Sequence, residues 1–343
     1  GRALSTEQDA STLPELSSGA VLVTGGTGAI GQRLARHLIE SHRVRHLVLT
    51  SRRGEDAPGM RELHDELTAL GAESVVIASC DVASRGEVDA LMARFTDEIP
   101  LSGVIHLAGV IQDGLISGLT PESLHAVMAP KVDGAWNLHA ATEGQELACF
   151  VLFSSLAGMM GNPGQGNYAA ANVFLDALAA ERSSRGLVAR SLAWGPWADS
   201  GMADTLDSVD QERMKRMGMT PLSGEDGLDL FDAALAHDGC ELMCAHFETK
   251  ILQRQANEGA TIAPLLRGLI TVQSQRTSLW LERLASMAEE ERFGTVLELV
   301  RTEVVSALGL ADIGLVAPDE PLQNLGLDSL IALELRNRLG QRF

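Results

Sequence analysis

Residues 21–38, VLVTGGTGAIGQRLARHL, decide the fold. The apolar run that begins at Val21 predicts a buried strand, and the segment after it has the apolar spacing of a helix. Between the two, Gly26, Gly28 and Gly31 form a GxGxxG motif. Glycines at such a junction let the backbone turn tightly and approach a pyrophosphate, which the free N–H groups and dipole of the helix N-terminus stabilise. The stretch therefore predicts the first unit of a dinucleotide-binding fold.

Six further apolar runs follow, with helical patterns between them. They begin at Arg45, Ser74, Gly103, Cys149, Ala189 and Glu241. Because they are apolar on both faces, they suit strands covered by helices on each side. Residues 20 to about 268 are therefore expected to form an α/β fold with a parallel, doubly wound sheet of about seven strands.

The end of the second predicted strand bears on the choice of cofactor. An NAD site usually has an acidic residue here for the ribose 2′-hydroxyl, but this chain has Ser51, Arg52 and Arg53. Two guanidinium groups suit a 2′-phosphate, so NADPH is favoured over NADH. A solvated pair of surface arginines is the alternative. After the third strand, Asp81 and Val82 lie where an adenine-contacting pair is expected.

Composition excludes several classes of function. The chain has 343 residues and a formal net charge of -19, which disfavours a nucleic-acid partner. Its four cysteines lack the paired spacing of a metal site and lie near no histidine cluster, so no metal is predicted. No apolar run is long enough to span a membrane, and the first residues lack a signal-peptide pattern. A cytoplasmic protein with reduced thiols is expected.

Candidate catalytic residues gather around the segment FSSLAGMMGNPGQGNYAAANVFLDALA. Ser155 closes a predicted strand, Tyr168 follows thirteen residues later, and Asn172 lies one helical turn beyond. Reduction of a ketone by hydride requires a group that stabilises the developing alkoxide and one that supplies a proton. A tyrosine hydroxyl can supply that proton when a neighbouring cation lowers its pKa. Lys131, on the helix before the Ser155 strand, is the candidate cation.

These motifs together resemble the ketoreductase of a modular type I polyketide synthase. TGGTGAIG, SRRG, CDV, HLAGV, PKVDGAWNLH, FSSLAG, GQGNYAAANVFLDALA and WGPW match that family's pattern in order across about 175 residues. Most short-chain dehydrogenases have the catalytic lysine four residues after the tyrosine, where this chain has Asn172. In the synthase ketoreductases the lysine and asparagine have exchanged places, which explains Lys131.

The resemblance implies a Rossmann-like short-chain dehydrogenase/reductase fold and a role for each residue. Tyr168 would be the proton donor, Ser155 a hydrogen-bond donor to the ketone oxygen, Lys131 the electrostatic and ribose-binding partner, and Asn172 a structural and proton-relay residue. Residues 198–221, with Met202, Met214, Met217 and Met219, are expected to form a mobile lid or to pack in the core. The full set of implied cofactor-binding residues is Thr24, Gly26, Thr27, Gly28, Ile30, Gly31, Ser51, Arg52, Arg53, Asp81, Val82, Ala108, Gly109, Lys131 and Tyr168.

The resemblance also predicts the stereochemistry of the product. Members that give L-hydroxy products have a tryptophan eight residues before the tyrosine, where this chain has Met160. Members that give D products read Leu-Asp-Asp after HLAGV, and this chain has Ile111, Gln112 and Asp113. Pro163 also fits the D pattern. A D-3-hydroxyacyl product, of the B type, is therefore expected.

The carboxyl-terminal segment NLGLDSLIALELRNRL resembles the phosphopantetheine attachment site of an acyl carrier protein, with Ser329 as the modified residue. Ser329 also suits the N-cap of a helix whose apolar stripe is Ile331, Leu335 and Leu339. The predicted organisation is a connector (1–20), a ketoreductase catalytic domain (21–268), a linker (269–283) and a truncated acyl carrier domain (284–343). The chain begins with Gly rather than Met and ends inside a helical pattern, so a piece of a longer chain is expected. The family's usual cofactor-free half has no room in residues 1–20.

The expected activity is NADPH-dependent reduction of a carrier-bound 3-ketoacyl thioester, with the carrier protein and the other synthase domains as partners. A catalytically silent, structural or epimerising module of the same synthase is the alternative. A free-standing sugar or alcohol dehydrogenase is disfavoured by the displaced lysine and the GLDSL segment.

Overall fold

The computed structural model describes residues 13–198, 214, 218–257, 262–270, 284, 286–310, 312–327, 331–332, 335–336 and 339. These residues fall into two compact units. Residues 13–198 with 221–246 form the first, and residues 214, 218–220 and the described residues from 247 onward form the second.

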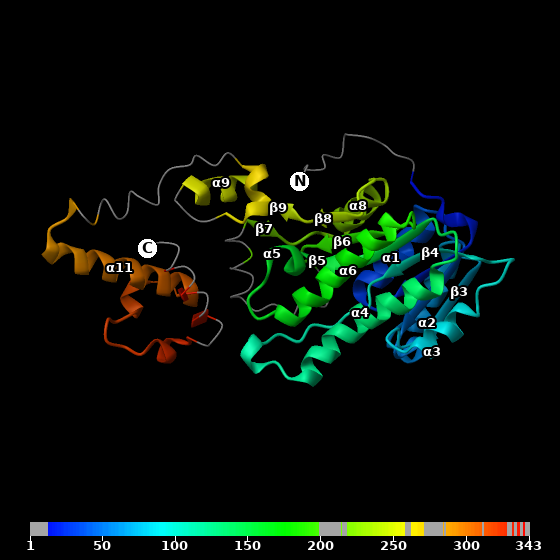
Figure 1. The fold of residues 1–343 in the computed structure, drawn as a ribbon, viewed down its shortest axis with the longest axis horizontal. Coiled ribbons are helices and arrows are strands. Elements are labelled where there is room, and N and C mark those ends of the chain that lie inside the picture. Colours follow the sequence, from blue (N-terminus) through cyan, green and yellow to red (C-terminus); the bar gives the residue numbers. More distant parts are fainter. Residues whose placement is uncertain are drawn as a thin grey trace. The chain divides into compact units, whose positions relative to one another are not determined.

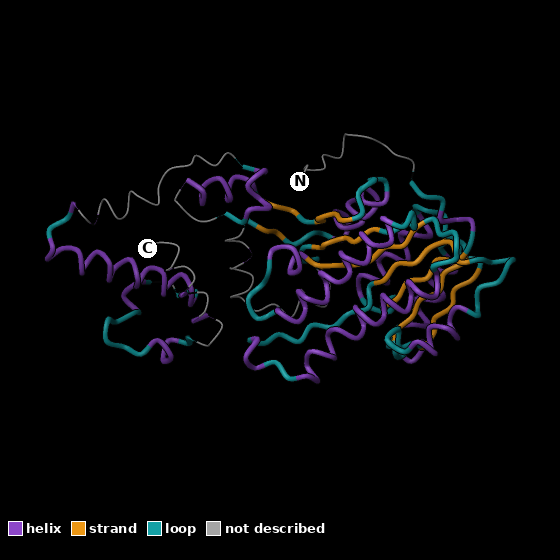
Figure 2. Tube along the Cα trace, viewed as in Figure 1, coloured by secondary structure: helices purple, strands orange, loops and turns teal. Residues whose placement is uncertain are grey.

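The first unit is built on one parallel sheet of seven strands in the order β3-β2-β1-β4-β5-β6-β8. Figures 1 and 2 show these strands side by side with helices packed along them. All seven strands match the apolar runs of the sequence, and the predicted Rossmann-like fold is confirmed. The strands are β1 (Ala20–Thr24), β2 (His46–Ser51), β3 (Ser74–Ser79), β4 (Leu101–His106), β5 (Cys149–Ser155), β6 (Arg190–Trp194) and β8 (Glu241–Cys244).

Helices cover both faces of this sheet. One face packs against α1 (Ala29–Glu40), α2 (Met60–Ala69) and α8 (Gly224–Leu235), and the other against α3 (Arg85–Met92), α4 (Pro121–Thr142) and α6 (Gly166–Ser184). Neighbouring strand residues contribute to opposite layers: Val21 and Val23 join the first apolar cluster, and Leu22 joins the second. Side chains alternate along a strand, so burial on both faces explains why the runs are continuously apolar.

Local sequence sets where the elements near the site begin and end. Thr120 and Ser123 form a reciprocal capping box at the start of α4, with Pro121 at the first helical position. Ser155 closes β5 and caps the short helix α5 (Leu156–Met160). The three-residue 3₁₀ helices of this unit are η1 (Leu16–Ser18), η2 (Gly54–Asp56) and η3 (Ile116–Gly118).

The described residues of the second unit are mainly helical. They include α9 (Thr249–Asn257), η4 (Pro264–Leu269), α11 (Glu289–Leu308), η5 (Ile313–Leu315) and η6 (Leu322–Leu325). The sequence predicted a helix from about Leu284 to Leu308. Leu284 and Ser286 are helical, and after a break at Ala288, whose backbone is extended, α11 runs from Glu289 to the predicted end at Leu308. Two-residue strands β7 (Met219–Thr220) and β9 (His246–Phe247) pair with each other; they are too short to give a sequence signal.

A small apolar core forms around α11. Val304, Ala307, Val316 and Leu335 are buried in it, with Ile331 and Leu339 packed against them. The predicted stripe of Ile331, Leu335 and Leu339 therefore faces one core. Over the part of the chain that the structure describes, none of the helices has the length and apolar character needed to cross a membrane.

Candidate active site

A tight glycine turn joins β1 to α1. Gly25 has a positive φ of 69°, and a Cβ on it would lie 2.9 Å from the backbone nitrogen of Ala108. A Cβ on Gly31 would lie 2.6 Å from the Cα of Gly26. Only glycine fits at these points, because backbone atoms would be displaced by any side chain. The turn and the start of α1 thus pack closely and leave the backbone bare.

The N-terminus of α1 faces this turn without a side chain of its own. Gly28 is the N-cap, no side chain caps it, and the first turn has no acidic residue. The first N–H groups of a helix need acceptors, and a phosphate supplies them together with the charge that the dipole favours. The turn therefore fits the pyrophosphate of a dinucleotide.

Thr24 and His106 form hydrogen bonds at the carboxyl end of β1, next to the glycine turn. The Thr24 hydroxyl lies 2.7 Å from Nδ1 of His106, and the backbone N–H of Ala108 donates to Thr24 Oγ1 at 3.4 Å. Thr24 was predicted to contact the cofactor, but its side chain is fully buried against His106. Burial, then the charge of Lys131, lowers the pKa of His106 to about 3, so this imidazole is neutral. Sequence reasoning gave His106 no role.

Arg52 and Arg53 lie at the carboxyl end of β2, beside η2. Both are exposed, and neither guanidinium has an ion pair within the described residues. An exposed arginine usually costs little to leave unpaired, so both remain available to an anionic ligand. Ser51, predicted with them, accepts a hydrogen bond from the backbone N–H of Gly54 at 3.1 Å.

Asn137 holds the Asp81-Val82 segment in place. Its Nδ2 atom donates to the backbone carbonyls of Val82 and Ala83, each at 3.0 Å, from the helix α4. Val82 is buried, and the Asp81 carboxylate accepts from the N–H of Ala83. Sequence reasoning assigned Asn137 no role, although this residue lies in the quoted motif PKVDGAWNLH. Its partners are fifty-five and fifty-four residues away in the sequence, so the contact is not visible before folding.

Lys131 crosses from α4 toward β5 over the bare backbone of Gly109. A Cβ on Gly109 would lie 2.9 Å from Lys131 Cε. The Nζ atom donates to the carbonyl of Phe153 at 2.8 Å and stands 5.4 Å from the centre of the Tyr168 ring. Burial lowers the pKa of Lys131 to about 8, although Asp176 opposes this shift. The predicted pairing of Lys131 with Tyr168, across thirty-seven residues of sequence, is a feature of the structure.

Tyr168, Ser155 and Asn172 surround the same space. Burial raises the pKa of Tyr168, while hydrogen bonding to the side chains of Asn172 and Ser155 works against the rise, so the phenol holds its proton. The Ser155 Oγ accepts from the N–H of Ala157 at 3.2 Å and also lies within hydrogen-bonding reach of the Tyr168 side chain. Asn172 Nδ2 donates to the Tyr168 carbonyl at 2.8 Å, and its buried Oδ1 has no partner within the described residues.

A loop after β4 is tied to the segment that precedes Tyr168. Nε2 of Gln165 donates to both Asp113 carboxylate oxygens at 3.1 and 3.2 Å, and Asn167 Nδ2 donates to the Gln112 carbonyl at 2.9 Å. The backbone of Gly114 also pairs with this segment. Gln165 thus holds Asp113 next to the segment that precedes Tyr168. Met160 and Pro163, predicted together with Asp113, are half-buried.

The predicted site residues of the first unit therefore gather at the carboxyl ends of the parallel strands. This is where ligands of open α/β sheets bind. Two predictions lie outside the described residues: Ser329, and most of the lid segment, including Met202 and Met217. Of that segment, Met219 is described and is buried in β7.

Taken together, the residues offer a glycine turn that fits a phosphate, a buried ammonium group, a protonated phenol and a serine hydroxyl beside that phenol. Such a set can bind a dinucleotide, hold a carbonyl oxygen and deliver a proton to it.

Comparison with known proteins agrees with this arrangement. The KR domain family matches residues 19–199, and the phosphopantetheine attachment site family matches residues 298–343. The chain is 50% identical over 330 residues to the spectinabilin polyketide synthase system protein NorB of Streptomyces orinoci, covering 94% of this chain and 15% of that protein. It is 44% identical over 335 residues to mycoketide-CoA synthase of Mycobacterium tuberculosis, covering 94% of this chain and 8% of that protein. The chain thus spans a small part of the length of these relatives.

Solved structures of ketoreductases have a similar fold. A structure described as A-type ketoreductases from a modular polyketide synthase superposes with a TM-score of 0.69 at 41% identity, covering 76% of this chain and 55% of that one. The first ketoreductase of the tylosin synthase superposes with a TM-score of 0.66 at 39% identity, covering 78% and 58%.

Proposed function

The chain belongs to the KR domain family, with a phosphopantetheine attachment segment after it, and from this premise we propose that it reduces the 3-keto group of a carrier-bound 3-ketoacyl thioester with NADPH. The observation that carries the proposal is the buried Lys131, whose Nζ lies 5.4 Å from the centre of the Tyr168 ring, while the Tyr168 side chain is hydrogen-bonded to that of Ser155. A silent module has no need to keep a buried ammonium group beside a protonated phenol, because burial of the charge costs stability.

NADPH is the proposed cofactor because of three fitting features. The glycine turn leaves bare backbone where a Cβ on Gly25 or Gly31 would intrude, the α1 N-terminus suits the pyrophosphate, and Arg52 with Arg53 suits the 2′-phosphate. When bound, NADPH supplies the hydride that forms the new C–H bond at C3 of the substrate.

The protein's own groups act on the oxygen of the ketone. The Ser155 hydroxyl donates a hydrogen bond to it, and the Tyr168 hydroxyl transfers its proton as negative charge develops there. The Lys131 ammonium group stabilises the phenolate that remains. The unpaired Oδ1 of Asn172 can accept a hydrogen bond from a water, and such a water would return a proton to Tyr168.

An assay of the full chain with NADPH and a 3-ketoacyl thioester of a short carrier mimic tests this proposal. We expect the NADPH absorbance to decay in proportion to the 3-hydroxyacyl product measured by mass spectrometry. The alternative is a silent or epimerising module. A silent module would oxidise no NADPH and exchange no α-hydrogen. An epimerising module would oxidise no NADPH but would exchange the α-hydrogen for deuterium from the solvent. Both results would overturn the reductase proposal.

A D-configured product, of the B type, is the stereochemical part of the proposal. Asp113, held by Gln165 beside the tyrosine segment, has the position from which a side chain can admit the thioester arm on one side only. The similar structure described as A-type shares 41% identity, which does not decide the matter, since the choice depends on a few residues. Chiral chromatography of the reduced product tests it: a mainly L product would show that Asp113 does not set the side of entry.

The second unit is proposed to carry the substrate arm. Ser329 would bear 4′-phosphopantetheine, and the acyl carrier and other synthase domains would be partners of the reductase. The small core around Val304 and Leu335 supports a folded helical unit near this segment. Incubation with a phosphopantetheinyl transferase and coenzyme A, followed by intact-mass measurement, tests the assignment. A mass increase that persists in the Ser329→Ala variant would refute it. The domain bounds 1–20, 21–268, 269–283 and 284–343 remain predictions alongside it.

A further inference from the structure

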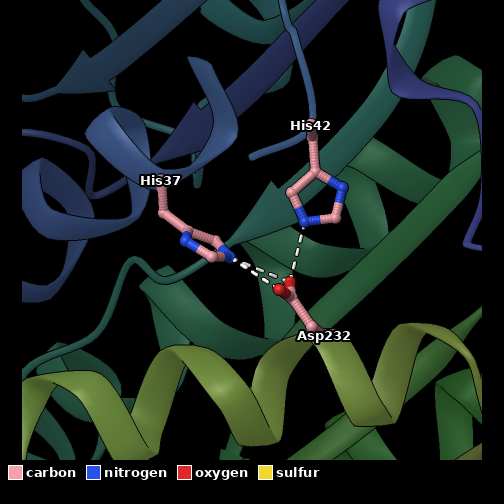
Figure 3. Close-up of side chains that lie close together, drawn as sticks. All are labelled: His37, His42 and Asp232. Atoms are coloured by element: carbon pink, nitrogen blue, oxygen red, sulfur yellow. Dashed lines mark hydrogen bonds and ion pairs between the residues drawn. The ribbon is translucent and has the colours of Figure 1, made fainter. Parts of the chain in front are cut away.

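Two histidines and one aspartate meet on the face of the sheet that α1 and α8 cover. His37 lies in the last turn of α1, His42 lies just after that helix, and Asp232 lies on α8 (Figure 3). None of them belongs to the candidate active site, which lies at the opposite end of α1. We refer to His37, His42 and Asp232 as the His–His–Asp cluster.

Both imidazoles direct the same nitrogen at one carboxylate. Nε2 of His37 lies 2.9 Å from each oxygen of Asp232, and Nε2 of His42 lies 2.7 Å from Oδ1. Figure 3 shows the two rings converging on the carboxylate from α1 and from the turn after it. The three potential ligand atoms lie within 4.8 Å of one another. Such convergence from separate parts of the chain is what a metal site requires.

The surroundings fix this geometry. Ser41 Oγ lies 3.2 Å from Nδ1 of His37, and as an acceptor from that nitrogen it would leave Nε2 as the coordinating atom. The His42 ring packs edge-on against Phe231, with the ring centroids 6.4 Å apart, and only 3% of its side chain is exposed.

We propose that the His–His–Asp cluster binds a divalent transition metal ion, with Zn²⁺ as the best fit. Two imidazole nitrogens and one carboxylate oxygen are a common zinc ligand set, and a water completes the tetrahedron. Bond lengths of about 2.0–2.2 Å place neighbouring ligand atoms about 3.3 Å apart in a tetrahedral site. The observed 2.7–2.9 Å contacts need to open by only about half an ångström. Asp232, 28% exposed, provides both the freedom to move and a route for the ion.

The ion would connect parts of the reductase unit that are distant in sequence. His37 and Asp232 are separated by 195 residues, and they join the first helix after the glycine turn to the helix before β8. A link across so long a loop stabilises a fold because the unfolded chain loses much freedom when it is closed. Because the cluster lies at the end of α1 opposite to the candidate active site, the ion is expected to act on the stability of the fold. The sequence predicted no metal, because the spacing of His37 and His42 in HLIESH becomes informative only when the fold brings Asp232 near.

Equilibrium dialysis of the full chain, without a histidine tag, against Zn²⁺ tests the proposal, with bound metal measured by inductively coupled plasma mass spectrometry. We expect one Zn²⁺ per chain and a rise in Tm that EDTA reverses. His42→Ala and Asp232→Asn should abolish that binding, and Ser41→Ala should weaken it by about tenfold, as loss of a supporting hydrogen bond does. Co²⁺ should give the visible absorption of a tetrahedral site in the parent and not in Asp232→Asn.

His64 provides the matched control. It is an exposed histidine that also contacts a carboxylate, Asp65, at 3.3 Å, but no third potential ligand joins them among the residues that the structure describes. His64→Ala should leave the stoichiometry and the Tm shift unchanged. Zinc binding that survives His42→Ala and Asp232→Asn, with both variants folded by circular dichroism, would overturn the proposal. So would the absence of bound metal at a several-fold excess of Zn²⁺, in which case the cluster is an ion-paired contact only.

Discussion

The glycine turn and the proposed catalytic cluster lie at the same edge of the sheet but are built in opposite ways. The turn between β1 and α1 depends on missing side chains, since a Cβ on Gly31 would lie 2.6 Å from the Cα of Gly26. The catalytic cluster of Lys131, Ser155, Tyr168 and Asn172 depends on side chains that are buried or half-buried. We therefore assign cofactor binding to the bare backbone of the turn and to exposed arginines, and proton transfer to the enclosed polar side chains of the cluster.

This difference separates the effects that mutations should have. An exposed arginine contributes to affinity, and its loss is partly screened by water. A buried proton donor contributes to the transition state, and nothing replaces it when it is removed. Changes at the turn or its arginines should therefore appear mainly in cofactor affinity, and changes in the cluster mainly in kcat.

Tyr168→Phe should have the largest effect. It removes the proton donor without changing the shape of the ring, so kcat should fall by about 10²–10⁴-fold, as is typical for loss of a general acid. The dissociation constant of NADPH, measured by fluorescence titration, should stay within about twofold of the parent value. A variant that keeps a kcat within about tenfold of the parent would remove Tyr168 from its assigned role.

Gly109→Ala tests whether bare backbone matters inside the catalytic cluster as it does in the turn. The new Cβ would lie 2.9 Å from Lys131 Cε, and the flexible end of the lysine can move aside at little cost in stability. Because a displacement of about 1 Å can cost up to about 100-fold in rate, kcat should fall towards that limit. Stopped-flow and thermal denaturation together should show a slow but stable variant.

Gly118→Ala is the control for this comparison. Nothing lies within 4 Å of a Cβ at Gly118, the last residue of η3, which follows β4 as Gly109 does. Its kcat should match the parent. If Gly118→Ala lowered kcat as much as Gly109→Ala, the effect would come from the loop and not from Lys131.

Arg52→Ala combined with Arg53→Ala tests the exposed side of the comparison. Loss of charge-assisted bonds to a 2′-phosphate should raise the KM for NADPH by about 10- to 100-fold and leave that for NADH almost unchanged. Arg45→Ala is the matched control, since Arg45 is an exposed arginine just before the opposite end of the same strand and pairs with Glu73. Equal losses for both cofactors would argue against a 2′-phosphate at this position.

The sequence predicted the regions of this molecule unequally, for physical reasons. The seven strands and the glycine turn are encoded locally, by continuous apolar runs and by glycines at fixed spacing, and all are confirmed. The pairing of Lys131 with Tyr168 is not local, and only resemblance to a family pointed to it. His106 and Asn137 were missed because their roles depend on partners, Thr24 and Val82, that the fold brings from distant segments.

The position of side chains within a correct element was also beyond the sequence. Thr24 was expected to face the cofactor, and its place at the end of β1 is as predicted, but its hydroxyl is turned to His106. A strand predicts which face a residue occupies, whereas the choice among hydrogen-bond partners at a strand end depends on the neighbouring strand. The register that pairs Thr24 with His106 makes that choice here.

The pH dependence of kcat/KM for NADPH should give the smallest effect and the sharpest distinction between the two protonated groups of the cluster. Burial lowers the pKa of Lys131 to about 8, so its charge is present below that pH and is lost as the pH rises through it. Burial raises the pKa of Tyr168, so the phenol stays protonated over the same range. Because kcat/KM reports groups of the free enzyme, it should be level below pH 7, fall by about half at pH 8 and continue to decline above it.

In Lys131→Arg, whose guanidinium keeps its charge, the decline should move to higher pH even if the plateau is lower. A decline at the same pH in that variant would assign the titration to a group other than Lys131. The loss of activity at high pH would then not come from loss of the lysine charge.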